Sequence, residues 1–306
     1  MHRPSIAIIG AGAVGSTIAY ALTIKNLAAE VMLIDVNEKK EEGEVMDISD
    51  AMCFVETGCV TNGNFRDARG ADIIIITAGV SQKPGDTRLD LLTKNANIVR
   101  SVFKGIGRLK KTAIIIIVTN PVDVITYLAQ TISGLPHNQV FGSGTTLDTA
   151  RLRKHVGETL GVSSQNVHGY VMGEHGNSQF VAWSSLTVGG MSAAHIKKLS
   201  APTKNVIEKK VQMGAYDIIE RKGATYYGIG LTVTDIVEAI IYNQYKILPV
   251  SARLTRWNGV SDICLGVPAI IAESGIQGQW PMSLPSAEKK KLWSSAETIR
   301  DHIKAL

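Results

Sequence analysis

The stretch "IAIIGAGAVGSTIAYAL", residues 6–22, decides the fold. A short apolar run leads into three glycines with GxGxxG spacing, and a helix-compatible segment follows. Gly10 allows a tight turn, Gly12 lets a phosphate approach the backbone, and Gly15 lets the helix pack closely on the strand. Amide groups at the helix start then face the anion. This order predicts the first unit of a doubly wound α/β sheet that binds a dinucleotide.

The next apolar run ends in Asp35, which follows Gly15 by 20 residues. An acid at this point can accept hydrogen bonds from the adenosine ribose, and it repels a 2′-phosphate. The pattern therefore favours NAD over NADP, while FAD remains an alternative from the motif alone. The other interpretation is a glycine turn followed by a strand-end aspartate that binds nothing.

Apolar runs without alternation recur through the first half, as in a parallel sheet buried on both faces. We expect strands at 6–9, 31–34, 73–76 and 114–118, and helices at 14–25, 39–52, 89–108 and 122–133. The alternation predicts a Rossmann-type doubly wound parallel sheet. It forms an NAD-binding domain at residues 1–143.

The pattern changes in the second half, where residues 144–306 predict a mixed α+β domain for the substrate. Helices are expected at 147–160, 202–222, 232–242 and 286–304. Residues 166–186 predict strands broken by a glycine-rich turn around His175, and residues 249–271 predict a hairpin sheet. We expect this second domain to pack on the first.

The composition, 45% hydrophobic and 19% charged over 306 residues, indicates a folded protein with a sizeable core. A net charge of +5 without a basic stripe argues against nucleic-acid binding. The three cysteines form no CxxC pair, which disfavours a disulfide framework or a metal site and favours a reducing compartment. No signal peptide or membrane-spanning run is recognised, so we expect a cytoplasmic protein.

Two strand ends carry polar residues that could meet a ligand. The segment "TAGVSQKPGDTRLDLL", residues 77–92, includes Gln82 and Arg88. An arginine on a loop could close over a substrate and polarise a carbonyl, or simply be a surface residue. The segment "TNPVD" places Asn120 in the same crevice, or it is an ordinary Asn-Pro turn. Pro121 permits a cis peptide before it.

The segment "GSGTTLDTARLRKHVG", residues 142–157, places Asp148 and Arg151 on one face of a helix. They could be a surface ion pair. The functional interpretation gives them separate partners: Asp148 orients a histidine, and Arg151 grips a carboxylate. The histidine would be His175 in "MGEHGNSQF", although a histidine in a turn is by itself weak support.

These segments, together with "GAGAVGS" and "KGATYYGIG", resemble the L-lactate/malate dehydrogenase family, and its L-lactate dehydrogenases most closely. The resemblance covers nearly the whole chain. It implies that His175 is the proton donor and acceptor, that Asp148 pairs with it, and that Arg88 polarises the carbonyl. The substrate-binding residues implied are Gln82, Arg88, Asn120, Arg151 and Thr225. The cofactor-binding residues implied are Gly10, Gly12, Ala13, Val14, Gly15, Asp35, Thr77, Ala78, Gly79, Asn95, Thr119, Asn120 and Ile229.

The resemblance also bears on the substrate. Malate-type members carry an arginine at the position of Gln82, so a neutral glutamine favours pyruvate and L-lactate, the fermentative end of glycolysis. Asn177 departs from the aspartate usual in lactate members. The run "GEHGNSQFVAW" is closer to the L-2-hydroxyisocaproate dehydrogenases. A broader L-2-hydroxy-acid dehydrogenase is therefore the alternative, and a malate dehydrogenase is a weaker one.

Finally, Arg153 and His168 match positions that bind fructose 1,6-bisphosphate between subunits in many bacterial lactate dehydrogenases. Two basic groups could hold a phosphate across a symmetric interface, or they could be two solvated residues. The resemblance thus implies an allosteric enzyme that assembles as a homo-oligomer, either a dimer or a homotetramer.

Overall fold

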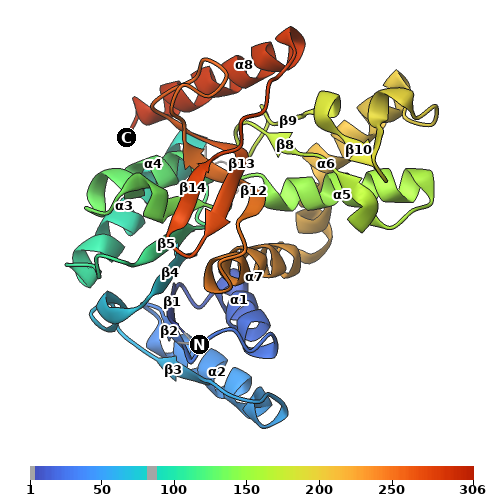
Figure 1. Cartoon of the computed structure of the whole chain (residues 1–306). Coiled ribbons are helices and arrows are strands. Elements are labelled where there is room, and N and C mark those ends of the chain that lie inside the picture. The colour runs from blue at the N-terminus through green and yellow to red at the C-terminus, as the bar shows by residue number, and fades with distance from the viewer. Residues whose placement is uncertain (1–3, 81–87) are drawn as a thin grey trace.

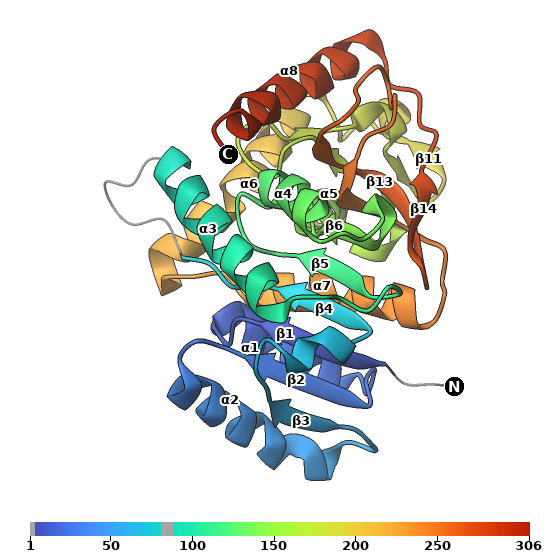
Figure 2. The same cartoon turned by 90° about the vertical axis from the view of Figure 1, so that its left-hand side faces the viewer.

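The computed structural model describes residues 4–80 and 88–306, and within these residues one nine-stranded sheet runs through the molecule (Figures 1 and 2). Six parallel strands have the order β3-β2-β1-β4-β5-β6. This is the strand order of a doubly wound sheet, the fold class that the sequence predicted. The strands are β1 (Ser5–Ile9), β2 (Glu30–Ile34), β3 (Cys59–Asn62), β4 (Ile73–Ile76), β5 (Ile114–Ile117) and β6 (Val140–Gly142).

Helices connect these strands and cover both faces of the sheet. On one face α3 packs beside α4, and on the other α1 packs beside α7 (Figure 1). The first four helices are α1 (Ala13–Ile24), α2 (Glu38–Asp50), α3 (Arg88–Ile106) and α4 (Val122–Ile132). Each lies within two residues of its predicted bounds, because the apolar faces and turn residues that mark the helices are clear in the sequence.

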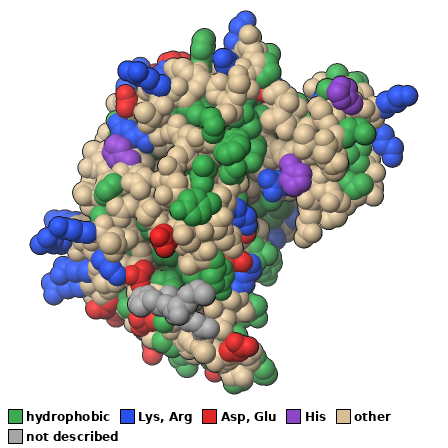
Figure 3. Space-filling view, in the orientation of Figure 1, with side chains coloured by type: hydrophobic (Ala, Val, Ile, Leu, Met, Phe, Trp, Pro, Cys, Tyr) green, Lys and Arg blue, Asp and Glu red, His purple; other side chains and the backbone are tan. Residues whose placement is uncertain are grey.

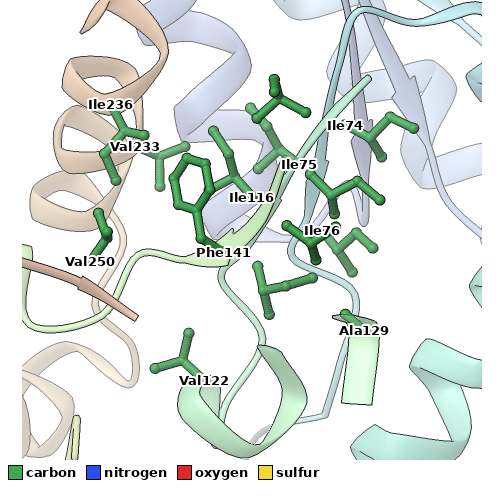
Figure 4. Close-up of a cluster of buried hydrophobic side chains, with 14 of the residues drawn as sticks. Ile74, Ile75, Ile76, Ile116, Val122, Ala129, Phe141, Val233, Ile236 and Val250 are labelled. Atoms are coloured by element: carbon green, nitrogen blue, oxygen red, sulfur yellow. The ribbon is translucent and has the colours of Figure 1, made fainter. Parts of the chain in front are cut away.

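The centre of the core is aliphatic. Strands β4 and β5 each consist of four isoleucines, all of them buried and in register from Ile73 opposite Ile114. Phe141 of β6 and Ile236 of α7 pack beside them (Figure 4). Burying each such side chain stabilises the fold by about 1.5–3 kcal/mol. The strand ends that carry polar residues are thereby held on a rigid frame.

Three antiparallel strands extend the same sheet beyond β6: β12 (Lys246–Arg253), β13 (Cys264–Ala272) and β14 (Gly275–Gln279). The sequence predicted this hairpin as part of a second domain, and in the structure the hairpin also continues the sheet of the first half. Ser251 of β12 pairs with Gly142 of β6. A Cβ on Gly142 would lie 3.0 Å from the Cβ of Ser251, so glycine permits the close approach that joins the two halves.

The remaining long helices are α5 (Thr146–Leu160), α6 (Ala201–Lys222), α7 (Tyr227–Ile241) and α8 (Ser286–Ile303). Helix α7 begins five residues before the predicted start. The early start was not predicted from the sequence because Gly228 and Gly230 have low helix propensity. A Cβ on Gly230 would lie 2.5 Å from Thr17 Cγ2, so this glycine lets α7 pack against α1.

Two small sheets complete the second half. Strand β7 (Val167–His168) pairs with β10 (Thr187–Val188), which pairs with β11 (Met191–Ser192). Strands β8 (Val171–Met172) and β9 (Phe180–Val181) form a hairpin around the turn that holds His175. Short 3-10 helices lie at Ala51–Phe54, Asp67–Gly70, His137–Gln139, Ser164–Asn166, Trp183–Ser185 and Ala193–His195.

One face of the molecule shows how its side chains of each kind are distributed (Figure 3). On the face drawn in Figure 3, Lys and Arg side chains lie mostly near the margins, and hydrophobic side chains occupy the middle. The described residues of this face therefore form no continuous basic groove of the kind that nucleic acid requires. In the described parts of the chain, no helix is both long enough and apolar enough to cross a membrane.

Candidate active site

The glycine turn after β1 is built for close approach. Gly10 has φ +109°, and a Cβ there would lie 2.7 Å from Thr77 Oγ1. A Cβ on Gly15 would lie 1.8 Å from the carbonyl oxygen of Gly10. A Cβ on Gly12 would meet no heavy atom within 4 Å, so the backbone of Gly12 faces open space. An anion can therefore reach the loop and the start of α1.

Asp35 lies beside this turn, at the end of β2. Its Oδ2 accepts a hydrogen bond from the amide of Ala11 at 2.7 Å, and its Oδ1 accepts one from the amide of Asn37 at 2.9 Å. A carboxylate has further lone pairs, so the half-buried side chain can still accept ribose hydroxyls. Loop and acid together fit the adenosine half of NAD.

Two predicted cofactor residues turn out to bond the protein itself. Asn95 is 1% exposed, and its Nδ2 donates to the carbonyl oxygens of Asn120 at 2.7 Å and Val80 at 3.2 Å. Its Oδ1 accepts from the amide of Val80 at 2.8 Å. Thr119 Oγ1 donates to the carbonyl of Ala78 at 2.8 Å. Asn95 and Thr119 therefore position the loops that follow β4 and β5.

The other predicted cofactor residues lie around the same crevice. Ala13 and Val14 form the first turn of α1, exposed and half-buried respectively. Thr77 Oγ1 donates to the carbonyl of Gly10 at 2.9 Å and so joins the end of β4 to the glycine turn. Gly79 packs against Thr119, where a Cβ would lie 2.8 Å from the threonine methyl group.

The turn between β8 and β9 brings His175 to Asp148 of α5. His175 Nδ1 lies 2.7 Å from Asp148 Oδ2. Arg151 Nη1 donates to the other oxygen, Oδ1, at 2.9 Å. The sequence predicted separate partners for Asp148 and Arg151, but in this structure they also pair with each other. The pair is largely buried, with side-chain exposures of 3% and 14%, so it is not the surface ion pair of the alternative interpretation.

The electrostatics favour a protonated histidine. Burial alone lowers the pKa of His175, but the charge and hydrogen bond of Asp148 outweigh it and raise that pKa above its ordinary value. Burial alone raises the pKa of Asp148, but His175 and Arg151 hold it below its ordinary value. The two groups therefore favour the imidazolium–carboxylate state of the pair over the state in which both are neutral.

A cavity of about 220 Å³ opens onto this pair. Asn120, Arg151 and His175 all line it, so the fold brings together two predicted substrate-binding residues and the predicted catalytic histidine. Asn120 precedes a cis peptide to Pro121. Further lining residues come from α3, α6 and α8. They include Leu91, Leu92, Ala215, Tyr216, Ile219 and His302.

Comparison with known proteins decides the family. The description "lactate/malate dehydrogenase, NAD binding domain" matches residues 5–142, and "lactate/malate dehydrogenase, alpha/beta C-terminal domain" matches residues 145–306. The chain belongs to the lactate/malate dehydrogenase family. Its cofactor is accordingly NAD, and the open backbone at Gly12 and the acid at Asp35 fit that group.

Curated relatives and solved structures agree with this membership. The chain is 42% identical to L-lactate dehydrogenase 1 of Clostridium acetobutylicum over 98% of both chains. It is also 42% identical to L-lactate dehydrogenase of Clostridium botulinum, over 99% of this chain and 96% of that protein. A minor L-lactate dehydrogenase from Enterococcus mundtii, solved in a ligands-bound form, superposes with TM-score 0.96 at 41% identity, covering 99% and 98% of the chains. A lactate dehydrogenase from a Medee basin deep-sea metagenome library gives TM-score 0.95 at 37% identity, covering 100% and 99%.

Several residues expected from the family resemblance lie away from this cavity or outside the described residues. Thr225 is half-buried in the loop between α6 and α7, and Ile229 packs against the core, so neither lines the cavity. Gln82 lies outside the described residues. Arg88 begins α3, but its side chain is likewise outside the described part.

Asn177, which departs from the lactate pattern of the family, anchors the histidine turn to α6. Its carbonyl oxygen accepts from Gln212 Nε2 at 3.0 Å, and its Oδ1 accepts from the Tyr216 hydroxyl at 3.5 Å. Asn177 and Tyr216 both line the cavity. This side chain thus helps to shape the wall that a substrate would meet.

The sequence reasoning missed a second carboxylate beside the histidine. Asp123 is 1% exposed in the first turn of α4, and its Oδ2 accepts from the backbone amide of His175 at 2.7 Å. Ser251 Oγ donates to its Oδ1 at 2.6 Å. The available signal was the acid within "TNPVD", one turn after Asn120, but nothing in the sequence links it to His175.

The two residues expected at a regulatory site differ in environment. Arg153 lies on α5, and its buried Nε has no hydrogen-bond partner among the described residues. Burial lowers the pKa of Arg153, although Tyr170 and Asp235 act in the opposite direction. His168 is exposed on β7 and pairs with Thr187 across the small sheet. Within the described residues no cluster of histidine, cysteine and acidic side chains suits a metal ion.

Proposed function

We propose that this chain is an NAD-dependent L-lactate dehydrogenase that interconverts pyruvate and L-lactate. One observation carries the proposal: His175, paired with Asp148 at 2.7 Å, opens onto the same cavity as Arg151 and Asn120. The surrounding chain is 42% identical to curated L-lactate dehydrogenases over nearly its full length. An acid–base group, a carboxylate clamp and a nicotinamide cofactor are the parts that 2-oxo acid reduction requires.

His175 acts as the proton donor in pyruvate reduction. Because Nδ1 is held by Asp148, the opposite nitrogen, Nε2, is the one left to donate to the developing alkoxide. The raised pKa of His175 favours the form of the ring that carries this proton. In lactate oxidation the neutral imidazole takes the proton back. When bound, NADH supplies the hydride that reduces the carbonyl carbon.

Arg151 binds the substrate carboxylate. Its guanidinium has five N–H donors, and the bond to Asp148 uses one of them, so a planar fork remains for the carboxylate. Asn120 also lines the cavity and can provide a polar contact. Arg88 and Gln82 are proposed from the family resemblance to polarise the carbonyl and to favour a methyl group over a second carboxylate.

The test is an NADH-oxidation panel with pyruvate, oxaloacetate and 2-oxoisocaproate. Pyruvate should give the highest kcat/KM, and His175→Asn should retain NADH binding while losing most turnover. Near-normal turnover in that variant would refute the assigned role. A higher kcat/KM for 2-oxoisocaproate would instead favour the broader L-2-hydroxy-acid dehydrogenase, for which the apolar wall of Leu91, Ala215 and Ile219 provides some support.

We further propose a homo-oligomer, dimer or tetramer, in which fructose 1,6-bisphosphate binds near Arg153 and His168. The unpartnered Nε of Arg153 supports an anion there. The sugar bisphosphate should lower the KM for pyruvate or change the assembly measured by light scattering, and no effect on either would refute the site. We also propose that the chain divides into two domains at 143/144. A cytoplasmic location is proposed as well, and the three unpaired cysteines support it.

A further inference from the structure

The carboxylate of Asp123 is the second acid at the histidine and has no part in the reaction as outlined so far. It is 1% exposed, and both of its oxygens are bonded within the protein. Oδ2 accepts from the amide of His175 at 2.7 Å, and Oδ1 accepts from Ser251 Oγ at 2.6 Å. A buried carboxylate is costly to maintain unless its partners compensate, so its place here requires an explanation.

These bonds join three separate parts of the chain. Asp123 lies at the start of α4, where the helix dipole favours negative charge, His175 lies in the turn after β8, and Ser251 lies on β12. Asp148 holds the ring of His175 through Nδ1, and Asp123 holds its main chain through the amide. The histidine is therefore fixed at two points, which restricts both its backbone and its ring and directs Nε2 to the cavity.

We propose that Asp123, held by Ser251, is a positioning residue that fixes the main chain of His175 and adds a second negative charge to stabilise its imidazolium. This inference rests on the proposed function, because it assigns a role toward the same proton donor. Asp148 remains the direct partner of the ring. Asp123 acts on the ring indirectly, through its bond to the backbone amide of His175 and through its negative charge.

The charges around both groups support the electrostatic part. Asp148, Asp123 and Arg151 face His175, and both carboxylates act to raise its pKa. Burial raises the pKa of Asp123 to about 6, although its bonds to Ser251 and His175 act to lower it. Glu174 adds a like charge that raises it further. Asp123 is thus ionised at neutral pH and loses its charge as the pH falls through about 6.

The thiol of Cys264 on β13 is a further titratable neighbour of Asp123. It is fully buried and donates to Gln130 Oε1 at 3.4 Å. Burial, followed by the charge of Asp123, raises the pKa of this thiol. Cys264 therefore stays neutral and adds no charge beside Asp123.

The decisive experiment compares Asp123→Asn with Asp72→Asn. Asparagine keeps the shape and the oxygen acceptor for the His175 amide but removes the charge. Asp72 precedes β4 at the opposite end of the sheet, where it bonds Lys110 and the amide of Ser5, so its variant is a matched loss of one carboxylate. The first readout is an NMR titration of His175 in the cofactor-free protein, with its resonance assigned among seven histidines by His175→Asn.

In Asp123→Asn the pKa of His175 should fall by about half a unit or more. The alkaline midpoint of kcat/KM for pyruvate reduction should fall with it. Asp72→Asn should leave both values in place. An unchanged His175 pKa and an unchanged pH profile in Asp123→Asn would overturn the proposal.

A second variant tests the support from β12 and does not alter Asp123 itself. Ser251→Ala removes a bond that lowers the pKa of Asp123, so that pKa, followed by carbon NMR of the carboxylate, should rise by about half a unit. An unchanged Asp123 pKa in this variant would count against the proposal. Failure of the unmodified chain to oxidise NADH with any 2-oxo acid would instead refute the proposed function, and the NMR titration would still test Asp123.

Discussion

Replacing Asp148 with asparagine removes the direct partner of the catalytic histidine. The bond from His175 Nδ1 is 2.7 Å long, and the carboxylate is only 3% exposed, so solvent screens it little. Hydrogen bonds to charged groups contribute about 1.5–3 kcal/mol. Since one pKa unit corresponds to about 1.36 kcal/mol, the pKa of His175 should fall by roughly one to two units in Asp148→Asn.

The sign of the effect on rate follows from the chemistry. Pyruvate reduction needs the imidazolium, which is present below the pKa of His175 and is lost as the pH rises through it. A lower pKa moves that loss to lower pH. Above the original pKa of His175, kcat/KM should therefore fall by roughly 10- to 100-fold. The assay is the pH dependence of NADH oxidation at subsaturating pyruvate, with NADH binding measured separately by fluorescence.

The same helix offers a matched control. His155 Nδ1 lies 3.2 Å from Glu158 Oε2, but the glutamate side chain is 57% exposed. Glu158→Gln therefore removes a carboxylate from a histidine pair that solvent already screens, and the pH profile should not change. If Asp148→Asn gave the same profile as Glu158→Gln, the argument from the buried pair would be refuted.

Three further predictions concern the cofactor loop and the second carboxylate. Gly15→Ala should lower Tm, because a Cβ would lie 1.8 Å from the carbonyl oxygen of Gly10. Gly12→Ala should keep Tm and weaken NADH binding, because a Cβ there meets no heavy atom within 4 Å. Equal melting temperatures of the two variants would contradict this. Asp35→Ser should raise the NADPH/NADH ratio of kcat/KM by about tenfold or more, since it removes the repulsion of a 2′-phosphate, and an unchanged ratio would count against that role. The pKa of Asp123, about 6 against the ordinary 3.8, corresponds to about 3 kcal/mol of folding stability that is present at low pH and lost as the pH rises through about 6. Urea denaturation of Asp123→Asn should lack this loss.

The fold was largely predictable because its long elements carry strong patterns. The isoleucine runs of β4 and β5 and the glycine turn at Gly10 predict the alternation of strands and helices in the first half. Strands β3 and β6 were missed because "CVTN" and "VFG" are too short to show a period. The pairing of β12 with β6 was also missed, since a sequence pattern gives no partner for an isolated hairpin.

The site was predictable only in part, and mainly through the family. Local spacing placed Asp148 and Arg151 on one helical face, but it could not place His175, 27 residues further along the chain, against that face. Asn95 was predicted to bind the cofactor, but its side chain bonds the backbone of Val80 and Asn120. Asp123 was overlooked because it accepts from the main-chain amide of His175. Nearly every residue type has such an amide, so the sequence does not indicate the contact.

The junction between β6 and β12 has a consequence for synthesis on the ribosome. Gly142 ends β6, and β12 begins at Lys246, which is 104 residues later. At about 5–20 residues per second, β6 emerges roughly 5–20 s before its neighbour exists. During that interval the nascent chain carries an unpaired strand edge beside a largely isoleucine core, a surface that other chains can pair with. Chaperone demand should therefore be highest between these two points, and slower translation across them should increase aggregation.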